Sequence, residues 1–178
     1  MAFRVRQEEP KDFHEVEDVI EEAFRGMEMS DHKEQAVVGK LRVSDAYVPE
    51  LALVAEGEDG KIVGHALLSE VLIRSGDQAL RSLSLAPVSV LPEFQKQGVG
   101  STLIEEGLKR ARELDYGSVI VLGNPEYYAR FGFVPAINLG VKAPFEVPDD
   151  SFMVLELRKG ELNGVSGTVQ YPAEFNLD

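Results

Sequence analysis

The stretch that decides the fold is Gln95-Lys96-Gln97-Gly98-Val99-Gly100-Ser101, which stands between two segments of different periodicity. Before it, residues 83–90 form an apolar, β-rich run that closes at Leu91-Pro92. After it, apolar or small side chains recur at the spacing of one helix face, at Leu103, Ile104, Gly107, Leu108, Ala111 and Leu114. A strand therefore leads through a glycine-bearing turn into a helix, whose first amides lack internal partners at the positive end of the helix dipole. This arrangement predicts an anion site suited to phosphate.

The residues of this turn do not match the two commonest phosphate-binding loops. A dinucleotide fingerprint requires Gly or Ala three residues after its second glycine, where this chain has Leu103. A P-loop ends in Gly-Lys-Ser/Thr, and neither Gly98 nor Gly100 is followed by lysine. The pattern that remains is Gln-x-x-Gly-x-Gly after Pro92-Glu93-Phe94. This pattern resembles the coenzyme A pyrophosphate loop of the GNAT superfamily of N-acetyltransferases. A nucleotide-binding protein of another family is disfavoured by Leu103.

A second motif follows one helix and one strand later. Residues 118–122 predict a short buried strand, which Gly123-Asn124-Pro125 ends. The next segment carries Tyr-x-x-x-Gly-Phe from Tyr128 to Phe133, which resembles the second signature of the same family. The two motifs occur in the family's order, and the resemblance covers about residues 3–135.

The resemblance implies an α/β (α+β), GNAT-like acyl-CoA N-acyltransferase fold. Its centre is a mixed, mostly antiparallel sheet, flanked by helices and splayed at the strands around Val88 and Val121. Pro87, which lacks an amide donor, fits a place where strand pairing lapses. The hydrophobic patterns agree with that order: a strand at 3–6, a helix from Pro10 to about Arg25, a second helix capped by Ser30 or Asp31, strands at 50–55 and 61–73, and a strand ending at Val90.

We expect one domain over residues 1–178, with a GNAT-like core at about 3–135 and a C-terminal extension at about 136–178. Asp149-Asp150-Ser151 predicts a turn before a strand at 152–157, and a last β segment follows Gly160. The extension can complete the sheet, cover the acceptor cleft or form a homodimer surface. The sequence does not choose among these roles.

The resemblance also assigns an acetyl-CoA site and implies no metal. The backbone of Val88 and Val90 is expected to meet pantetheine and the thioester, and the amides that follow are expected to meet the pyrophosphate. Tyr128, a phenol protonated at neutral pH, is expected to donate to the leaving thiolate, with Tyr127 as a weaker substitute. The alternative for each of these side chains is ordinary packing. The cofactor-binding residues are predicted to be Val88, Val90, Gln95, Lys96, Gln97, Gly98, Val99, Gly100, Ser101 and Asn124.

The group that deprotonates the acceptor is less evident. Many relatives carry a Glu eleven residues before the glutamine of the loop, and this chain has Ser84 there. Ser84 is therefore predicted as a catalytic residue that holds a water and relays a proton. Other acidic candidates are Glu22, Asp31, Glu70 and Glu126. His32 lies in the segment that lines the acceptor side in relatives, whereas His14 and His65 are interpreted as structural.

Composition limits the function classes. The chain has 178 residues, 44% hydrophobic and 28% charged, with no cysteine and a net charge of −13. No cysteine means no disulfide or thiolate site, and the negative charge disfavours nucleic acid while attracting cationic amines. The beginning of the chain shows no apolar signal region and no run of membrane-spanning length, so we expect a cytoplasmic protein without a membrane partner.

The predicted function is transfer of an acetyl group from acetyl-CoA to a primary amine by direct attack in a ternary complex. The acceptor is expected to be a small or exposed cationic amine. The alternative, supported by Ser84 in place of a carboxylate, is a catalytically silent acyl-CoA-binding or sensing module.

Overall fold

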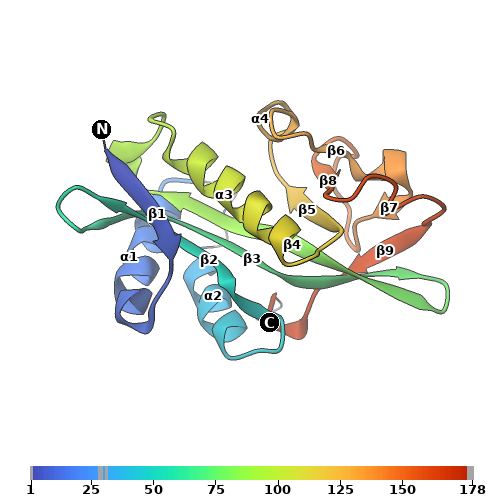
Figure 1. Cartoon of the computed structure of the whole chain (residues 1–178), viewed down its shortest axis with the longest axis horizontal. Coiled ribbons are helices and arrows are strands. Elements are labelled where there is room, and N and C mark those ends of the chain that lie inside the picture. The colour runs from blue at the N-terminus through green and yellow to red at the C-terminus, as the bar shows by residue number, and fades with distance from the viewer. Residues whose placement is uncertain (1, 28–29, 31, 176–178) are drawn as a thin grey trace. The chain divides into compact units, whose positions relative to one another are not determined.

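The computed structural model describes residues 2–27, 30 and 32–175 (Figure 1). The chain divides into two compact units, and each is described by itself. The first comprises residues 1–69, 86–110 and 174–178, and the second comprises residues 70–85 and 111–173. The long strands β3 (Ile62–Ser75) and β4 (Gln78–Val90) and the helix α3 (Val99–Glu113) each begin in one unit and end in the other.

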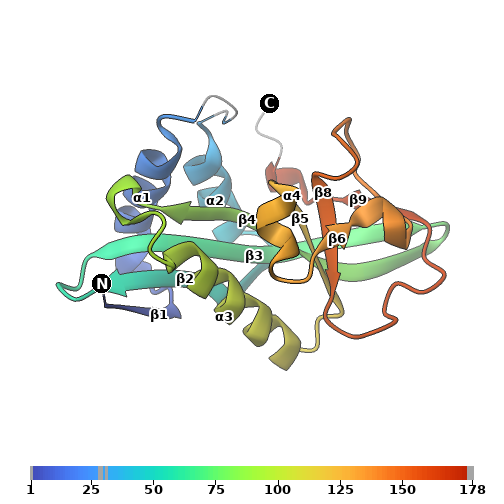
Figure 2. The ribbon, with the colours of Figure 1, turned by 90° about the horizontal axis from the view of Figure 1, so that it is seen from above.

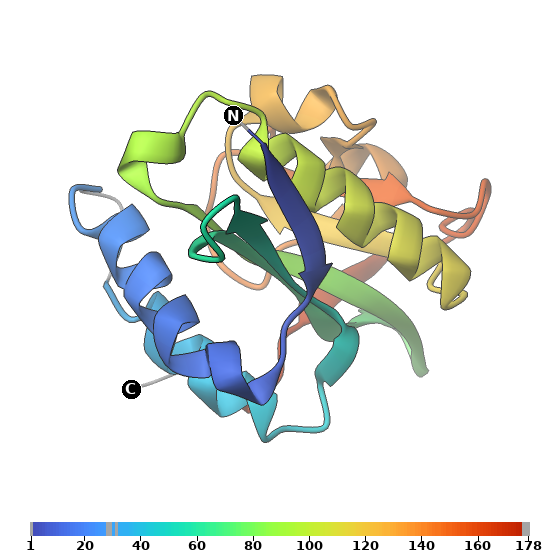
Figure 3. The ribbon, with the colours of Figure 1, turned by 60° about the vertical axis from the view of Figure 1, so that its left-hand side comes forward.

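The first unit is a sheet between helices. β1 (Phe3–Gln7) pairs antiparallel with β2 (Tyr47–Gly57), which pairs antiparallel with β3. Helices α1 (Phe13–Phe24) and α2 (Glu34–Arg42) lie on one face of these strands, and α3 lies on the other (Figures 1 and 3). Short 3-10 helices stand at Pro10–Asp12 (η1), Pro92–Phe94 (η2) and Ala173–Phe175 (η4).

The helices form where the apolar spacing predicts them, but one predicted cap is wrong. α1 buries one face, made of Val16, Val19, Ile20 and Ala23. The N-cap of α2 is Lys33, which makes no side-chain cap bond. Ser30 does not cap the helix: its hydroxyl accepts the N–H of His32 at 2.9 Å and donates at 2.5 Å to the side-chain carboxylate of Glu34, the first residue of α2. Asp31, the other predicted cap, lies outside the described residues.

Two glycines bring α3 close to its sheet. An added Cβ at Gly64 of β3 would lie 2.8 Å from Cγ1 of Val99 and 3.1 Å from Cδ1 of Leu103. One at Gly107 of α3 would lie 2.7 Å from Cδ1 of Leu68. The distances of 2.8 and 2.7 Å are shorter than real Cβ contacts, so a side chain at either position would require its neighbour to shift. The beginning of α3 is therefore held directly against β3, with Val99 and Leu103 in the core.

The second unit is a second set of strands with a short helix. β5 (Ser118–Leu122) pairs parallel with β4 on one side and antiparallel with β8 (Phe152–Glu156) on the other. β6 (Val134–Pro135) pairs with β8, and β9 (Gly167–Gln170) pairs with β3 and with β7 (Val141–Lys142). The short helix α4 (Pro125–Ala129) packs against β6 and β8 (Figure 2). A 3-10 helix, η3, covers Ala136–Leu139.

The parallel pairing that joins β4 to β5 is short. Among the described residues, its register covers Leu83 with Val119 and Ser84 with Ile120, whereas β5 continues to Leu122 with β8 alone as its partner. The predicted splay of the strands around Val88 and Val121 stays a prediction. The mixed, mostly antiparallel sheet with flanking helices confirms the predicted fold class.

The C-terminal extension completes the sheet, which confirms one of its three predicted roles. Its strand β8 pairs with every residue of β5, and β9 pairs with the second half of β3. Two predicted core positions are wrong: Leu114 is 37% exposed and Leu122 is 48% exposed. Both are the last residues of their patterns, where the flanking elements no longer cover them.

Candidate functional site

The predicted phosphate loop lies in the first unit, between β4 and α3. The N–H of Leu91 donates to the carbonyl of Val63 at 2.9 Å, which fixes the exit from β4 on β3. The chain then turns through Lys96 and Gly98, which have φ values of 62° and 87°. Positive φ favours glycine, and Lys96 adopts it at some cost. The turn directs the chain into α3 at Val99.

Side chains of the loop hold its own backbone. Nε2 of Gln95 donates to the carbonyl of Val90 at 3.2 Å, and Nε2 of Gln97 donates to the carbonyl of Glu93 at 3.1 Å. The hydroxyl of Thr102 donates to the carbonyl of Gly98 at 2.8 Å. The structure therefore brings Gln95 and Val90 together, and the side chains of both glutamines stabilise the loop by hydrogen bonds to its backbone.

Two amides at the beginning of α3 precede the first described hydrogen bond of the helix. The N–H of Thr102 reaches the carbonyl of Gly98 at 3.0 Å, so the helical bonds begin there. The amides of Val99 and Gly100 precede that first bond and lie at the positive end of a 15-residue helix. The space where Gly98 would carry a Cβ is open, with nothing within 4 Å. Val99 itself is buried and can offer only its backbone.

Val88 and Val90 lie on the part of β4 that precedes the loop. Both are half-buried and pack against the core of the first unit. Their side chains thus have the packing role that the sequence left open, and their predicted backbone contacts with pantetheine stay a prediction.

In the second unit, Asn124 caps the helix that carries Tyr128. Its Oδ1 accepts the N–H of Glu126 at 2.9 Å and of Tyr127 at 3.3 Å. Its carbonyl accepts the N–H of Tyr128 at 3.1 Å. The structure thus brings Asn124 and Tyr128 together through the backbone of α4, and the side-chain oxygen of Asn124 is already used.

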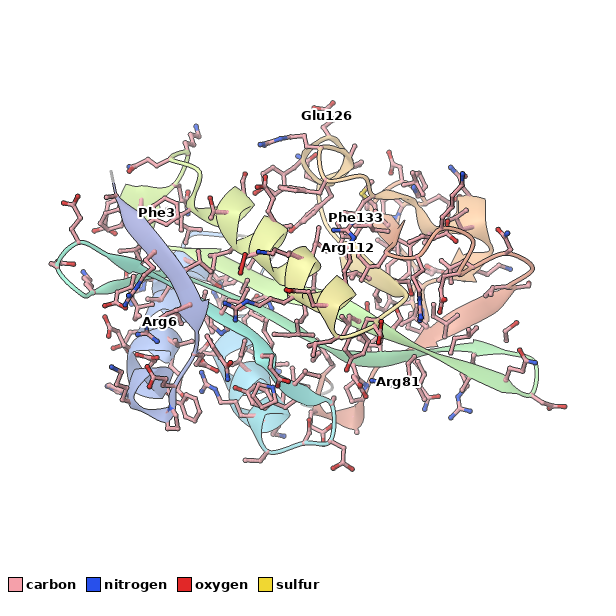
Figure 4. The ribbon with its side chains drawn as sticks, viewed as in Figure 1. Phe3, Arg6, Arg81, Arg112, Glu126 and Phe133 are labelled. Atoms are coloured by element: carbon pink, nitrogen blue, oxygen red, sulfur yellow. The ribbon has the colours of Figure 1, made fainter. Side chains whose placement is uncertain are left out.

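The ring of Tyr128 is held by its neighbours. It contacts the rings of Tyr127, Phe131 and Phe133 at centroid distances of 5.1, 6.4 and 5.8 Å. On its other side, a Cβ at Gly123 would lie 2.5 Å from its Cε2. Figure 4 shows Phe133 turned inward beneath α4, whereas Glu126 points outward.

The hydroxyl of Tyr128 is protonated and unengaged. Among the described residues it makes no hydrogen bond. Burial raises the pKa of Tyr128 to about 12, with a further contribution from Tyr127. A fixed phenol that stays protonated at neutral pH can donate to a developing anion.

The predicted proton relay at Ser84 has a buried environment. Ser84 is 2% exposed on β4, opposite Ile120 of β5. Its neighbour on the same face, Ser82, bonds to the hydroxyl of Ser118 at 2.8 Å. No described hydrogen bond links Ser84 to Asn124 or Tyr128, and its role stays a prediction.

The other acidic candidates have separate surroundings. Glu22 pairs with Arg25 at 2.8 Å on the surface. Glu70 accepts from Arg81 at 2.6 Å and from the hydroxyl of Tyr116, so it belongs to a network of its own. Glu126 is exposed, and Asp31 lies outside the described residues.

His32 lines a pocket of about 310 Å³ in the first unit. Glu21, Phe24, Arg25, Glu34 and Gln35 complete its lining. The position is compatible with the acceptor-side prediction for His32 without testing it. His14 is exposed near Asp18, at 3.9 Å.

Sequence reasoning missed a buried ionic network in the first unit. Nη2 of Arg42 lies 2.5 Å from Oε1 of Glu8, and the hydroxyl of Tyr47 donates to Oε2 at 2.9 Å. Nε2 of the buried His65 lies 3.5 Å from the same carboxylate. Burial acts to raise the pKa of Glu8, but His65 and Arg42 outweigh it and lower that pKa to about 2. The partners are far apart in sequence, so no local pattern could reveal them.

Comparisons with known proteins identify the family. The sequence model of the acetyltransferase (GNAT) family matches residues 12–133. The uncharacterized N-acetyltransferase YhbS of Escherichia coli is 34% identical over 126 residues, which are 71% of this chain and 74% of the relative. The chain belongs to the GNAT family of acetyltransferases.

Solved structures of two relatives agree with this assignment. The crystal structure of YhbS from Escherichia coli in complex with CoA has a TM-score of 0.86 and 29% identity, and it covers 98% of this chain and 92% of its own. A GNAT acetyltransferase from Brucella melitensis in complex with acetyl-CoA has a TM-score of 0.81 and 35% identity, with 98% and 99% covered. In the ranges that the structure describes, no helix has the length and apolar character needed to span a membrane.

Proposed function

We propose that the protein transfers an acetyl group from acetyl-CoA to a primary amine by direct attack in a ternary complex. The observation that carries this proposal is the loop at residues 95–101, which opens into α3 with the amides of Val99 and Gly100 ahead of the bond from Thr102 to Gly98 and with open space at Gly98. Two relatives of the same fold were solved with CoA and with acetyl-CoA. Acetyl-CoA is therefore the cosubstrate that suits this loop.

The loop holds the pyrophosphate through its backbone. The amides of Val99 and Gly100 donate to phosphate oxygens, and the helix dipole favours their negative charge. Gly98 provides the positive φ that aims these amides, and Gln95 and Gln97 keep the turn in shape. Lys96, exposed beside the turn, adds a positive charge.

Tyr128 stabilises the leaving thiolate. A thiol has a reference pKa of about 8.5, whereas that of Tyr128 is about 12. Complete proton transfer to a free thiolate is therefore uphill by roughly 5 kcal/mol. The phenol acts chiefly as a hydrogen-bond donor while the tetrahedral intermediate collapses, and the proton that the amine loses neutralises the thiolate.

The attacking amine must lose its proton, and no carboxylate stands at Ser84. A cationic acceptor of pKa about 10 is only about 0.1% neutral at pH 7. We propose that a water held by Ser84 relays this first proton toward solvent before attack; the second proton, which the nitrogen loses after attack, is the one that neutralises the thiolate. The rate is then expected to rise with pH through about 7 to 9.

A thiol-release assay tests the proposal and separates it from a silent acyl-CoA-binding module. Protein, acetyl-CoA and a panel of amines are mixed at pH 8, and free thiol is measured together with the mass of the acetylated product. The proposal expects thiol release that depends on one class of amine. Tight acetyl-CoA binding without release for any amine favours the silent module, for which Ser84 is the supporting observation.

A further inference from the structure

A second pocket lies in the second unit, beside the segment that joins β7 to β8. Its volume is about 310 Å³, within the range of about 300–1,000 Å³ typical of small-molecule sites. Ile137, Phe145 and Phe152 supply apolar walls, and Lys142, Glu146 and Asp149 supply charged groups. None of the residues assigned to the acetyl-CoA site lines it. The pocket therefore has no role in the function proposed so far.

Phe145 is the distinctive part of its wall. This side chain is 45% exposed, although its ring lies edge-on to Phe152 at 6.0 Å and nearly parallel to the ring of Tyr171 at 6.1 Å. Two rings thus fix Phe145 while much of its surface faces solvent. An exposed aromatic face of this kind attracts apolar groups and cations.

The charged groups favour a cation. Glu146 and Asp149 are exposed, and neither takes part in an ion pair among the described side chains. Lys142 offsets one of these two carboxylates, so the three groups together carry a net negative charge. An anionic ligand would be repelled, and an ammonium group would gain both carboxylate and aromatic contacts.

The pocket is connected to Tyr128 through the end of β5. Phe152 pairs with Leu122, and the carbonyl of Ser151 accepts the N–H of Gly123 at 3.0 Å. Gly123 is the residue that lies against the ring of Tyr128. One wall of the pocket and the proposed thiolate donor are therefore attached to the same strand end.

We propose that this pocket selects the acceptor: it binds an organic amine whose apolar body packs against Phe145 and whose positive charge faces Glu146 and Asp149. The body is an aromatic ring or a branched alkyl chain, because small polar amines offer nothing to the aromatic wall. This inference rests on the proposed function, since it takes the bound amine to be the acetyl acceptor: the carboxylates attract its ammonium form, which loses its proton before the nitrogen attacks.

The test uses 2-phenylethylamine as the probe and ethanolamine as its polar counterpart. Calorimetry measures their binding to the full chain without acetyl-CoA. The variants are Phe145→Ala, Phe145→Leu, which keeps apolar bulk but lacks a ring, and the double variant Glu146→Gln/Asp149→Asn. Asp150→Asn is the matched control, because Asp150 is an exposed neighbour that does not line the pocket. Thermal unfolding checks that each variant is folded.

We expect the unaltered chain to bind 2-phenylethylamine more tightly than ethanolamine. The double variant and both Phe145 variants are expected to bind 2-phenylethylamine at least about fivefold more weakly than the unaltered chain does. Asp150→Asn is expected to match the unaltered chain. Equal affinity in all variants, or no binding of 2-phenylethylamine, would overturn the inference.

Turnover separates this inference from the proposed function. In the thiol-release assay, the pocket variants are expected to raise KM for 2-phenylethylamine and to leave acetyl-CoA affinity unchanged. If amines are acetylated with a KM indifferent to these variants, the pocket inference is wrong and the function stands. If 2-phenylethylamine binds through Phe145 and no amine is acetylated, the pocket is an amine-binding site, and its role in selecting the acceptor fails together with the proposed function.

Discussion

The residue to which we assign the most direct chemical role in the proposed function is Tyr128, whose ring packs between Gly123 and three aromatic neighbours while its hydroxyl makes no hydrogen bond to the described residues. Replacement by phenylalanine removes only the hydroxyl and keeps this packing. We expect Tyr128→Phe to lower kcat at least about tenfold, which is less than the loss of about 10²–10⁴ typical of a removed general acid, because Tyr128 acts chiefly as a hydrogen-bond donor and water can substitute in part. Acetyl-CoA affinity, measured by calorimetry, is expected to stay the same.

Tyr127→Phe is the matched control, because Tyr127 is the adjacent phenol on the same helix. It is expected to leave kcat nearly unchanged. The pH profile adds a second readout: the pKa of Tyr128 is about 12, so its deprotonation does not lower the rate below about pH 11. Equal kcat for Tyr128→Phe and the unaltered chain would assign Tyr128 to packing alone.

Gly98 is the residue on which the loop geometry depends. Its φ of 87° disfavours any side chain, although the space around it is open. Gly98→Glu is expected to cost about 1 kcal/mol of stability through backbone strain and to abolish acetyl-CoA binding through repulsion of the pyrophosphate. Gly98→Asn tolerates positive φ better and separates strain from charge. Calorimetry that shows unchanged acetyl-CoA affinity in a folded Gly98→Glu protein would refute the loop assignment.

At the scale of elements, the position of α3 depends on the absence of a side chain at Gly64. Gly64→Ala would push against Val99, Leu103 and the carbonyl of Ser89, and at least two of these cannot move freely. We expect a loss of about 1–3 kcal/mol of stability together with weaker acetyl-CoA binding, because the amides at the beginning of α3 move with Val99. Urea unfolding and calorimetry measure the two effects.

Gly39→Ala provides the contrast. Gly39 lies inside α2, and an added Cβ would meet nothing within 4 Å. Alanine is expected to stabilise the protein by about 0.5–1 kcal/mol without changing acetyl-CoA affinity. If both glycine variants behave alike, the close approach of α3 to β3 is not what positions the loop.

The ionic network that joins β1, α2 and β3 gives a prediction on pH. The pKa of Glu8 is lowered from 4.5 to about 2, so its stabilising contribution is present above about pH 4.5 and is lost as pH falls toward 2. By linkage, roughly 2 kcal/mol disappears between pH 7 and pH 3. Urea unfolding is expected to show the stability gap between the unaltered chain and Glu8→Gln shrinking by about this amount, and a pH-independent gap would contradict it.

Regular elements were predictable from the sequence where periodicity was strong. The apolar face of α3 and the alternation of strand and turn around the loop depend on local spacing, so the fold class and both motifs could be found. The cap of α2 was wrong because the Ser30 hydroxyl had a better local partner. The Glu8–Arg42 pair joins residues 34 positions apart, and the pocket at Phe145 depends on strand register. Neither the Glu8–Arg42 ion pair nor the pocket at Phe145 can be detected from the spacing of neighbouring residues in the sequence.

At the scale of the whole molecule, the net charge of −13 is expected to concentrate cationic acceptors. Raising the ionic strength from 0.1 to 1 M shortens the screening length from about 10 to about 3 Å. KM for a cationic amine is therefore expected to rise several-fold with salt, whereas KM for an amine that is neutral at pH 8 is expected to stay nearly constant. Turnover limited to neutral or anionic acceptors and indifferent to salt would show the electrostatic argument to be wrong.

The most direct test of the central claim is a two-substrate initial-rate matrix, in which thiol release is measured while acetyl-CoA and an accepted amine are varied together. Direct attack in a ternary complex predicts that no thiol forms without amine and that the double-reciprocal lines intersect. Parallel lines, or a burst of thiol before any amine is added, would mean that the acetyl group first passes to the protein, and that result would contradict direct attack in a ternary complex.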